Sequence, residues 1–478
     1  MMIDTGVLSL FYSFVVIISY MLYILDLGVY DKGYLCISVV ISIAVIILFF
    51  FRKERFQMLK FNFFSPVILF IIGFWIVHFQ FYFDLLLGNF TEFDYKFFVK
   101  PNIIYKSSLI SLIGLSSFLL GYVFCTPSKK QRIYKSYNDI STKILSFFNL
   151  VLVFLFIKTA GWAYINGGYG RVSLEDTIST YYSLFITLIS FSIMILKSYG
   201  NSSFIDGRKK FIDYMKMYDG LFYISIITYI SVVILSGDRG PAIVLLTSFV
   251  FNYFLISRKK MKITYFLLSI FIAASLISLL GDVRTHSGYV DSFSEKMDIA
   301  LSDDSKGNSF LPITEELAGS VRCLNYALDY VPEKHPYLYG SIFFKNIISA
   351  IPFSSGLMRN FLDDSFKYRS SASFITWIEQ GDFPNSGAGT TCIADIYIDF
   401  GLIGVVILLF IFGFIFKYVE VNLFCFKNVS LWIYCLGFIL MAYAIYIPRS
   451  SFLLQFRSLV WLYFIIKIFL YLRRKNAG

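Results

Sequence analysis

Charged residues are scarce in this chain of 478 residues, where they make up 15% of the total; soluble domains have roughly 25%. Histidine occurs only 3 times, and the 6 cysteines show no paired spacing. The sequence also lacks a Walker loop, an HExxH motif and a GxSxG motif. These absences argue against a soluble domain and leave the common nucleotide, zinc-protease and serine-hydrolase signatures without support.

Apolar residues dominate instead, at 57% of the chain, with 20% aromatic residues and a mean hydropathy of +0.70. Windows of about 20 apolar residues, the length that crosses a bilayer, recur from end to end. The windows are continuous rather than alternating, which favours helices over a closed barrel. The sequence therefore predicts an all-α polytopic membrane protein.

Basic clusters between these windows indicate the topology. The first cluster is Arg52–Arg55, and assigning it and the later clusters to the cytoplasm leaves both termini on that side. The net charge of +11 is explained by this one-sided distribution, so no nucleic-acid partner is predicted. About twelve transmembrane helices result. Their windows are residues 7–25, 34–51, 64–83, 104–125, 144–164, 181–196, 221–236, 241–256, 263–280, 392–416, 431–447 and 452–472.

One long polar stretch, residues 281–390, interrupts this pattern. We expect nine helices in residues 1–280, a long outward loop with short helices in residues 281–390, and three helices in residues 391–478. Within the loop, Gly340–Phe353 is amphipathic, which is typical either of a helix lying at the membrane interface or of one packed inside the loop.

Arginines at the outward ends of helices are the first candidates for a binding site. Arg239, Arg284 and Arg449 run against the positive-inside pattern, and a guanidinium fork matches phosphate oxygens. They indicate a site for a lipid-linked anionic substrate. Asp238, next to Arg239, is included among the candidate substrate-binding residues; alternatively, the two residues pair and orient the turn. Arg322 is interpreted individually as ordinary surface charge.

Charges inside apolar windows call for partners, because an unpaired charge is costly in lipid. Asp395 and Asp399 lie four residues apart, hence on one helical face, and Arg457 lies within the last window. We expect Arg457 to form a structural ion pair with one of the two aspartates.

Candidates for a general base are His286, Glu315 beside Glu316, and Glu379 with Asp382 nearby. The carboxylate pairs elsewhere in the loop have no third ligand at a fixed spacing and are interpreted as solvated turn residues. The sequence predicts no metal site.

Two segments resemble a known family. Gly237–Gly240 forms a short outward turn ahead of a long loop, and Gly387–Gly401 opens the helix that re-enters the membrane, with Gly404 after it. Together they are similar to the polymerases of O-antigen and capsule polysaccharide, the Wzy type. The similarity covers the second half of the chain in motifs and all of it in topology.

This resemblance implies an inner-membrane glycosyltransferase, and a GT-C-like architecture is compatible with it. The enzyme would transfer the growing glycan from undecaprenyl diphosphate to the non-reducing end of another lipid-linked repeat unit, at the periplasmic face. By motif position the resemblance points to Arg239, and also to Arg284 and Arg369, as functional arginines. It implies no cofactor, since the donor is already activated. Candidate partners are donor and acceptor lipids, the membrane, a chain-length regulator and a flippase.

Other functions fit parts of the pattern. An O-antigen ligase has a similar plan, and the residues near His286 do not separate the two. A flippase or other transporter with about twelve helices belongs to a different class, which the long outer loop disfavours. A non-catalytic assembly partner would tolerate substitution of Arg239.

Overall fold

The structure is a computed structural model of the whole chain. It describes residues 2–25, 32–56, 59, 62–90, 101–126, 141–165, 177–200, 210–238, 240–269, 309–352, 354, 365–425 and 429–475. These residues form helices and one isolated β-bridge, between Ile3 and Arg52. The fold is therefore all-α in its described part, as the continuous apolar windows predict.

The helices fall into two groups along the chain, before and after the long polar stretch begins. In the first group they are α1 (Thr5–Leu25), α2 (Lys32–Phe50), α3 (Pro66–His78), α4 (Gln80–Leu87), α5 (Pro101–Phe124), α6 (Lys143–Ala163), α7 (Thr177–Gly200), α8 (Phe211–Met215), α9 (Gly220–Ser236) and α10 (Gly240–Ser257). In the second group they are η4 (Pro312–Thr314), α13 (Glu315–Ala318), α14 (Val321–Tyr330), α15 (Ser341–Ile348), η5 (Phe366–Tyr368), α17 (Ser371–Gln380), α18 (Cys392–Cys425), α19 (Leu431–Tyr443), η6 (Ile447–Arg449) and α20 (Phe456–Lys475).

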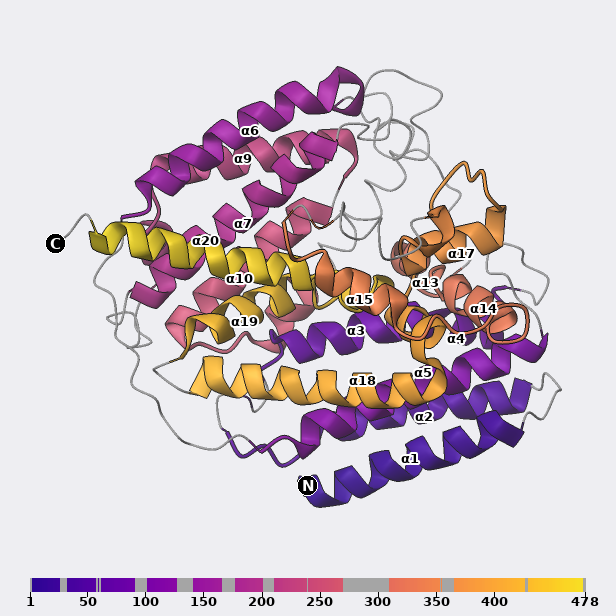
Figure 1. Ribbon diagram of the computed structural model, residues 1–478. Helices are drawn as coiled ribbons and strands as arrows, with labels where there is room; N and C mark the ends of the chain where they lie inside the picture. The colour runs from indigo at the N-terminus through magenta and orange to yellow at the C-terminus, as the bar shows by residue number, and fades with distance from the viewer. Residues whose placement is uncertain are drawn as a thin grey trace.

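Helix α5 is the centre of one half of the bundle, with α1, α2 and α18 packed around it (Figure 1). Its contact with α18 is close because glycines face the partner backbone. A Cβ atom at Gly121 would lie 1.9 Å from the carbonyl oxygen of Phe410, and one at Gly413 would lie 1.9 Å from that of Phe118. Small residues let transmembrane helices approach in this way, since lipid supplies no hydrophobic force to press them together.

The other half of the bundle contains α6, α7, α9, α10, α19 and α20 (Figure 1). Polar side chains join helices within it. The amide of Asn149 on α6 donates to the hydroxyl oxygens of Ser190 on α7 and Ser225 on α9, at 3.1 and 3.0 Å. All three side chains are buried, so these hydrogen bonds satisfy groups that would otherwise be costly in an apolar interior.

Seven helices in the described ranges are long and apolar enough to cross a membrane, or eight if α3 and α4 form one span bent by 46°. Helices α9 and α19 are apolar but shorter. The multi-pass character is thus confirmed, whereas the described residues do not confirm the expected count of about twelve. The expected window at residues 263–280 lies largely outside the described residues, and α20 carries Arg457 and Lys467 in its interior.

One end of the bundle holds the N-terminus and a buried ion network. Ile3 pairs with the chain after α2, accepting a hydrogen bond from the Lys53 amide at 2.7 Å. Glu54 binds Arg52 at 3.3 Å and Lys417 of α18 at 2.6 Å. Because all three side chains are nearly buried, the contacts fix this loop to α18.

The short helices α13, α14, α15 and α17 gather at the opposite end, on the right of Figure 1. Helix α15, from the amphipathic segment, packs against α18 and α20. Ile342 and Lys345 are buried there, while Phe344 on the same helix is 59% exposed. The polar segment is therefore folded onto the ends of the long helices.

Candidate functional site

The described part of the polar segment, which starts at Ser309, contacts α4 of the bent span α3–α4. Gln80, at the start of α4, is fully buried and donates to the Ser309 hydroxyl at 2.9 Å and to the Leu311 carbonyl at 3.1 Å. Asp84, also buried, accepts a hydrogen bond from the Ser309 hydroxyl at 2.5 Å. Buried polar groups need such partners, so these contacts fix the segment to the membrane helices.

A first ion pair joins the short turn after α19 to this segment. Arg449, the last residue of η6, places Nη2 3.4 Å and Nη1 3.5 Å from Oε1 of Glu316 on α13. Pro448 suits the start of the 3₁₀ turn, because its fixed φ fits that position. The Arg449 side chain remains 29% exposed, so its guanidinium is both held and accessible.

A second ion pair lies between α14 and α17. Nη1 of Arg322 is 3.7 Å from Oε1 of Glu379. Tyr326 lies one turn after Arg322, and burial together with the negative charge of Glu379 raises the pKa of its phenol. The Glu379 side chain is 19% exposed and that of Arg322 33%, which leaves both groups within reach of a ligand.

Charges from both ion pairs act on the side chain of Cys323. Its thiol is fully buried and donates to the carbonyl of Ala388 at 3.4 Å. Burial raises the pKa of Cys323 to about 11, while the charges of Arg322 and Arg449 lower it in part and that of Glu379 raises it. The charges of both guanidinium groups and of one carboxylate therefore affect the pKa of the same thiol. We call Arg322, Arg449, Glu316 and Glu379 the ion-pair cluster.

The first turns of α18 lie beside the segment that follows Arg449. Asp395 accepts hydrogen bonds from the Ser451 hydroxyl and the Phe452 amide, each at 2.9 Å. Asp399 accepts one from the Phe343 amide at 2.8 Å, in the first turn of α15, where a carboxylate is favoured by the helix dipole. Both aspartates thus position the segments on either side of the cluster.

The expected pairing of Arg457 with Asp395 or Asp399 does not occur. Each carboxylate is satisfied by hydroxyl or backbone donors. The guanidinium carbon of Arg457 instead lies 5.7 Å from the centre of the Trp461 ring. The expectation was wrong because groups in the η6–α20 connection and in α15 already donate hydrogen bonds to the two carboxylates.

Several expected site residues fall elsewhere. Arg239, Arg284 and His286 lie outside the described residues. Asp238 accepts a hydrogen bond from the Gly240 amide at 3.2 Å and one from the Tyr164 hydroxyl at 3.4 Å, so it helps to begin α10.

Other expected residues lie within the described part of the polar segment. Arg369 is exposed at the end of η5, and Glu315 begins α13 next to Glu316. Asp382 accepts a hydrogen bond from the Trp377 indole at 2.8 Å. Within the described ranges, no three His, Cys, Asp or Glu side chains gather in a way that could hold a metal ion.

The structure adds Arg322, whose sequence position alone suggests only surface charge. Nothing in the sequence links it to Glu379, because the two residues lie on different helices, α14 and α17. Their proximity arises from the way the two helices pack. Only the three-dimensional arrangement therefore identifies Arg322 as part of a site.

Comparison with known families gives the decisive observation. Residues 7–475, nearly the whole chain, match the family described as O-antigen polysaccharide polymerase Wzy. The chain belongs to this family. The comparisons with curated proteins and with solved structures found no match. Wzy membership confirms the resemblance carried by Gly237–Gly240 and Gly387–Gly401, and it identifies a polymerase that acts on lipid-linked oligosaccharide repeat units.

The ion-pair cluster contains the kinds of groups that a Wzy polymerase could use to bind an anionic substrate and to accept a proton. Two guanidinium groups that remain partly accessible can bind the oxygens of an anionic substrate in a bidentate manner. Each is held in place by a carboxylate, and a carboxylate released from its arginine can accept a proton. Cation and base are therefore available within one cluster of side chains.

Proposed function

We propose that this protein extends a surface polysaccharide by transferring the growing glycan from undecaprenyl diphosphate to the non-reducing end of a second lipid-linked repeat unit. The observation that carries the proposal is the ion-pair cluster around Cys323, at the end of the membrane helices. A diphosphate leaving group develops negative charge as the glycosidic bond breaks, and fixed arginines stabilise such charge.

The orientation follows from the distribution of basic residues. The end of the bundle with Ile3, Arg52 and Lys53 carries the first basic cluster, which belongs in the cytoplasm under the positive-inside rule. In this arrangement the protein lies in the inner membrane, and the opposite end of the bundle, with α13, α14 and α17, faces the periplasm. Both termini are cytoplasmic in this arrangement.

In the proposed reaction, Arg449 and Arg322 bind the diphosphate of the donor. When Arg322 turns to the phosphate, it releases Glu379, from which it is separated by 3.7 Å in the present structure. Glu379 then accepts the proton of the acceptor hydroxyl. The acceptor oxygen bonds to the anomeric carbon, the bond from that carbon to the phosphate oxygen breaks, and undecaprenyl diphosphate departs with the electron pair.

Further residues complete the proposed site. Glu316 orients Arg449, and Asp395 and Asp399 hold the backbone around the cluster. Arg369 is a candidate for a second contact with the lipid-linked anion, as are Arg239 and Arg284. His286 and Glu315 are the alternative bases. A flippase and a chain-length regulator are the expected protein partners.

The test is reconstitution of the purified protein in liposomes with a synthetic polyprenyl-diphosphate repeat unit. Wild-type protein should produce a ladder of glycans, and Arg449→Gln or Arg322→Gln should leave single units. The matched control is Lys334→Gln, which removes an exposed ion pair with Asp329 from the same polar segment and should keep the ladder.

Other outcomes would contradict the proposal. Movement of unextended repeat units across the bilayer without any ladder indicates a flippase. Transfer of the glycan only to an added lipid A core, with no extension of lipid-linked units, indicates a ligase. An unchanged ladder from both arginine variants would remove the ion-pair cluster from the reaction.

A further inference from the structure

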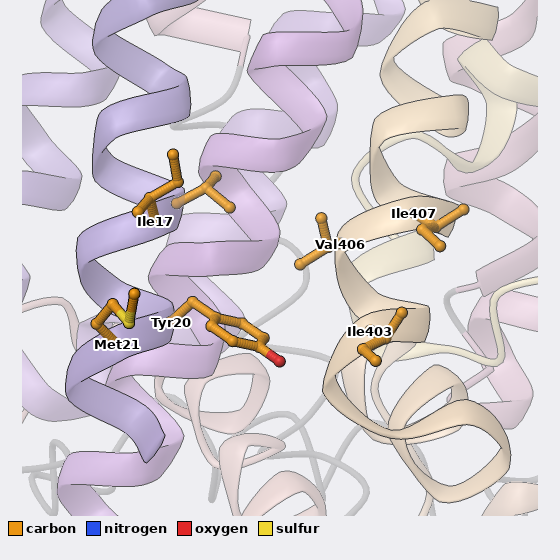
Figure 2. Close-up of a pocket in the computed structure, with 7 residues that line it drawn as sticks. Ile17, Tyr20, Met21, Ile403, Val406 and Ile407 are labelled. Atoms are coloured by element: carbon orange, nitrogen blue, oxygen red, sulfur yellow. The ribbon is translucent and has the colours of Figure 1, made fainter. Parts of the chain in front are cut away.

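A groove runs along the membrane-facing surface between α1 and α18. Both helices pack on α5, and the space between them has a volume of about 250 Å³ (Figure 2). In Figure 2, Tyr20 of α1 and Val406 of α18 point toward this space from its two sides. The walls also include Ile17, Met21, Ile403 and Ile407. The lining is apolar and branched, and the Tyr20 hydroxyl is its polar group.

The groove ends next to the polar segment. Tyr23, one turn beyond the groove on α1, places its hydroxyl 3.1 Å from that of Tyr397 on α18. The Tyr397 hydroxyl also lies within hydrogen-bonding distance, 3.3 Å, of the carbonyl of Val331, directly after α14. Tyrosines with one polar and one apolar end are typical of the depth where lipid headgroups begin. We therefore place this end of the groove at the boundary between acyl chains and headgroups.

Helix α18 connects the groove to the ion-pair cluster. Asp395 binds Ser451, which follows Arg449 by two residues. Ile403, in the groove wall, follows Asp395 by eight residues. Between them the helix is interrupted at Gly401, whose φ of 65° and ψ of −162° are not helical. The partner of the arginine turn therefore precedes this break in α18, and the apolar wall follows it.

We propose that the α1–α18 groove binds the isoprenoid chain of the polyprenyl-diphosphate carrier, in the part nearest the diphosphate. The inference rests on the proposed function, because it assumes that the arginines hold the diphosphate of the same molecule. A volume of about 250 Å³ is below the roughly 300–1,000 Å³ of pockets that enclose a whole small ligand. The groove therefore fits a short part of one chain.

The physical basis of selectivity is shape rather than hydrophobicity. A chain that moves from bulk lipid into the groove gains no hydrophobic free energy, since both surroundings are apolar. Binding then depends on close van der Waals contact, which a methyl-branched chain can make with the branched side chains of Ile17, Ile403 and Val406. Retention of the diphosphate by arginine raises the effective concentration of the attached chain beside the groove.

The first experiment fills the groove. Val406→Trp and Ile17→Trp place a large ring in it, and the matched control is Ile411→Trp, at an exposed position further along α18. Each variant is reconstituted with donors that carry either an undecaprenyl or a geranyl chain. We expect roughly a tenfold rise in KM for the undecaprenyl donor with little change in kcat, because a binding contact common to ground and transition states is lost.

The geranyl donor separates this effect from general damage. A chain that short makes few contacts in the groove, so its KM should be unchanged in both groove variants, and the control should behave as wild type with both donors. Groove variants with a wild-type KM for the undecaprenyl donor would overturn the proposal. Absence of a ladder from wild-type protein with either donor would instead contradict the proposed function itself.

A second experiment uses wild-type protein, so it does not depend on whether the variants fold. A photoreactive polyprenyl diphosphate should label peptides from α1 and α18, and excess undecaprenyl diphosphate should prevent the labelling. Phosphatidylglycerol vesicles at the same concentration should not. Equal competition by phosphatidylglycerol would show an unspecific lipid contact, and labelling confined to other helices would place the chain elsewhere; either result overturns the proposal.

Discussion

Arg449 and Glu316 are 3.4 Å apart although 133 residues of sequence separate them. The contact brings the short turn before α20 onto the polar segment that follows the first group of membrane helices. It holds the planar guanidinium in one orientation while leaving it partly exposed. In the proposed function this relationship matters because a fixed fork can bind two phosphate oxygens at once.

Replacing Arg449 with lysine tests this geometry. Lysine keeps the positive charge but loses the planar fork. We expect Arg449→Lys to lower the rate of ladder formation on the order of a hundredfold, the size of effect seen when a donor to a developing negative charge is removed. The rate is measured in liposomes with a synthetic donor. A variant with full activity would mean that charge alone suffices at this position.

Glu379 provides a test of the proton transfer. In Glu379→Gln the side chain keeps its shape but cannot accept the acceptor proton. We expect kcat to fall by at least roughly a hundredfold while the donor still binds, since the arginines are unchanged. Glu333→Gln, at an exposed position of the same segment, is the control. Loss of donor binding together with activity would indicate that Glu379 only positions Arg322.

The buried thiol of Cys323 predicts a pH dependence of stability. Burial raises its pKa from the ordinary 9.0 to about 11, so the folded protein keeps a proton that the unfolded chain loses. The stabilisation from this group is complete below about pH 9 and is lost as the pH rises toward 11.

The measurement for Cys323 is thermal unfolding in detergent from about pH 8 to about pH 10.5. The decrease in Tm over this range should be smaller in Cys323→Ala than in wild type. Cys36→Ala is the control, because Cys36 is exposed on α2. Parallel decreases in wild type and Cys323→Ala would show that the thiol does not contribute.

Close packing of α5 on α18 predicts strong effects of small substitutions. An alanine at Gly413 would place Cβ 1.9 Å from the Phe118 carbonyl, so the helices must separate. We expect Gly413→Ala to destabilise the protein by about 1–3 kcal/mol, as overpacking does. Gly220→Ala is the control, since its Cβ would meet no atom within 4 Å. Both are compared by size-exclusion chromatography after heating.

The sequence predicts the position of many helices because a membrane span requires a continuous apolar run. The window at residues 104–125 corresponds to α5, and the window at residues 7–25 to α1. Hydropathy does not reveal where such a run bends. The window at residues 64–83 forms two helices meeting at Phe79, and Gly401 interrupts α18 within its apolar part. Both irregularities depend on packing between segments.

Part of the candidate site could also be predicted from the sequence. Arg449 and Glu379 are identified by residue type and place, because an arginine in an outward turn needs an explanation and a carboxylate can act as base. Their partners Glu316 and Arg322 become evident only through tertiary contacts. The two aspartates of α18 are predicted to need partners, but the hydroxyl and amide donors that supply them could not be foreseen from charge alone.

The hydrogen bonds of Asp395 have a consequence for biogenesis. Ser451 and Phe452, its donors, are synthesised 56 and 57 residues after it. Helices α18 and α19 are therefore synthesised before this carboxylate can meet its native donors. The end of α18 that carries Asp395 should reach its final arrangement only as the last helix enters the bilayer, so nascent chains that stop short of Ser451 would carry all the earlier spans yet lack an assembled candidate site.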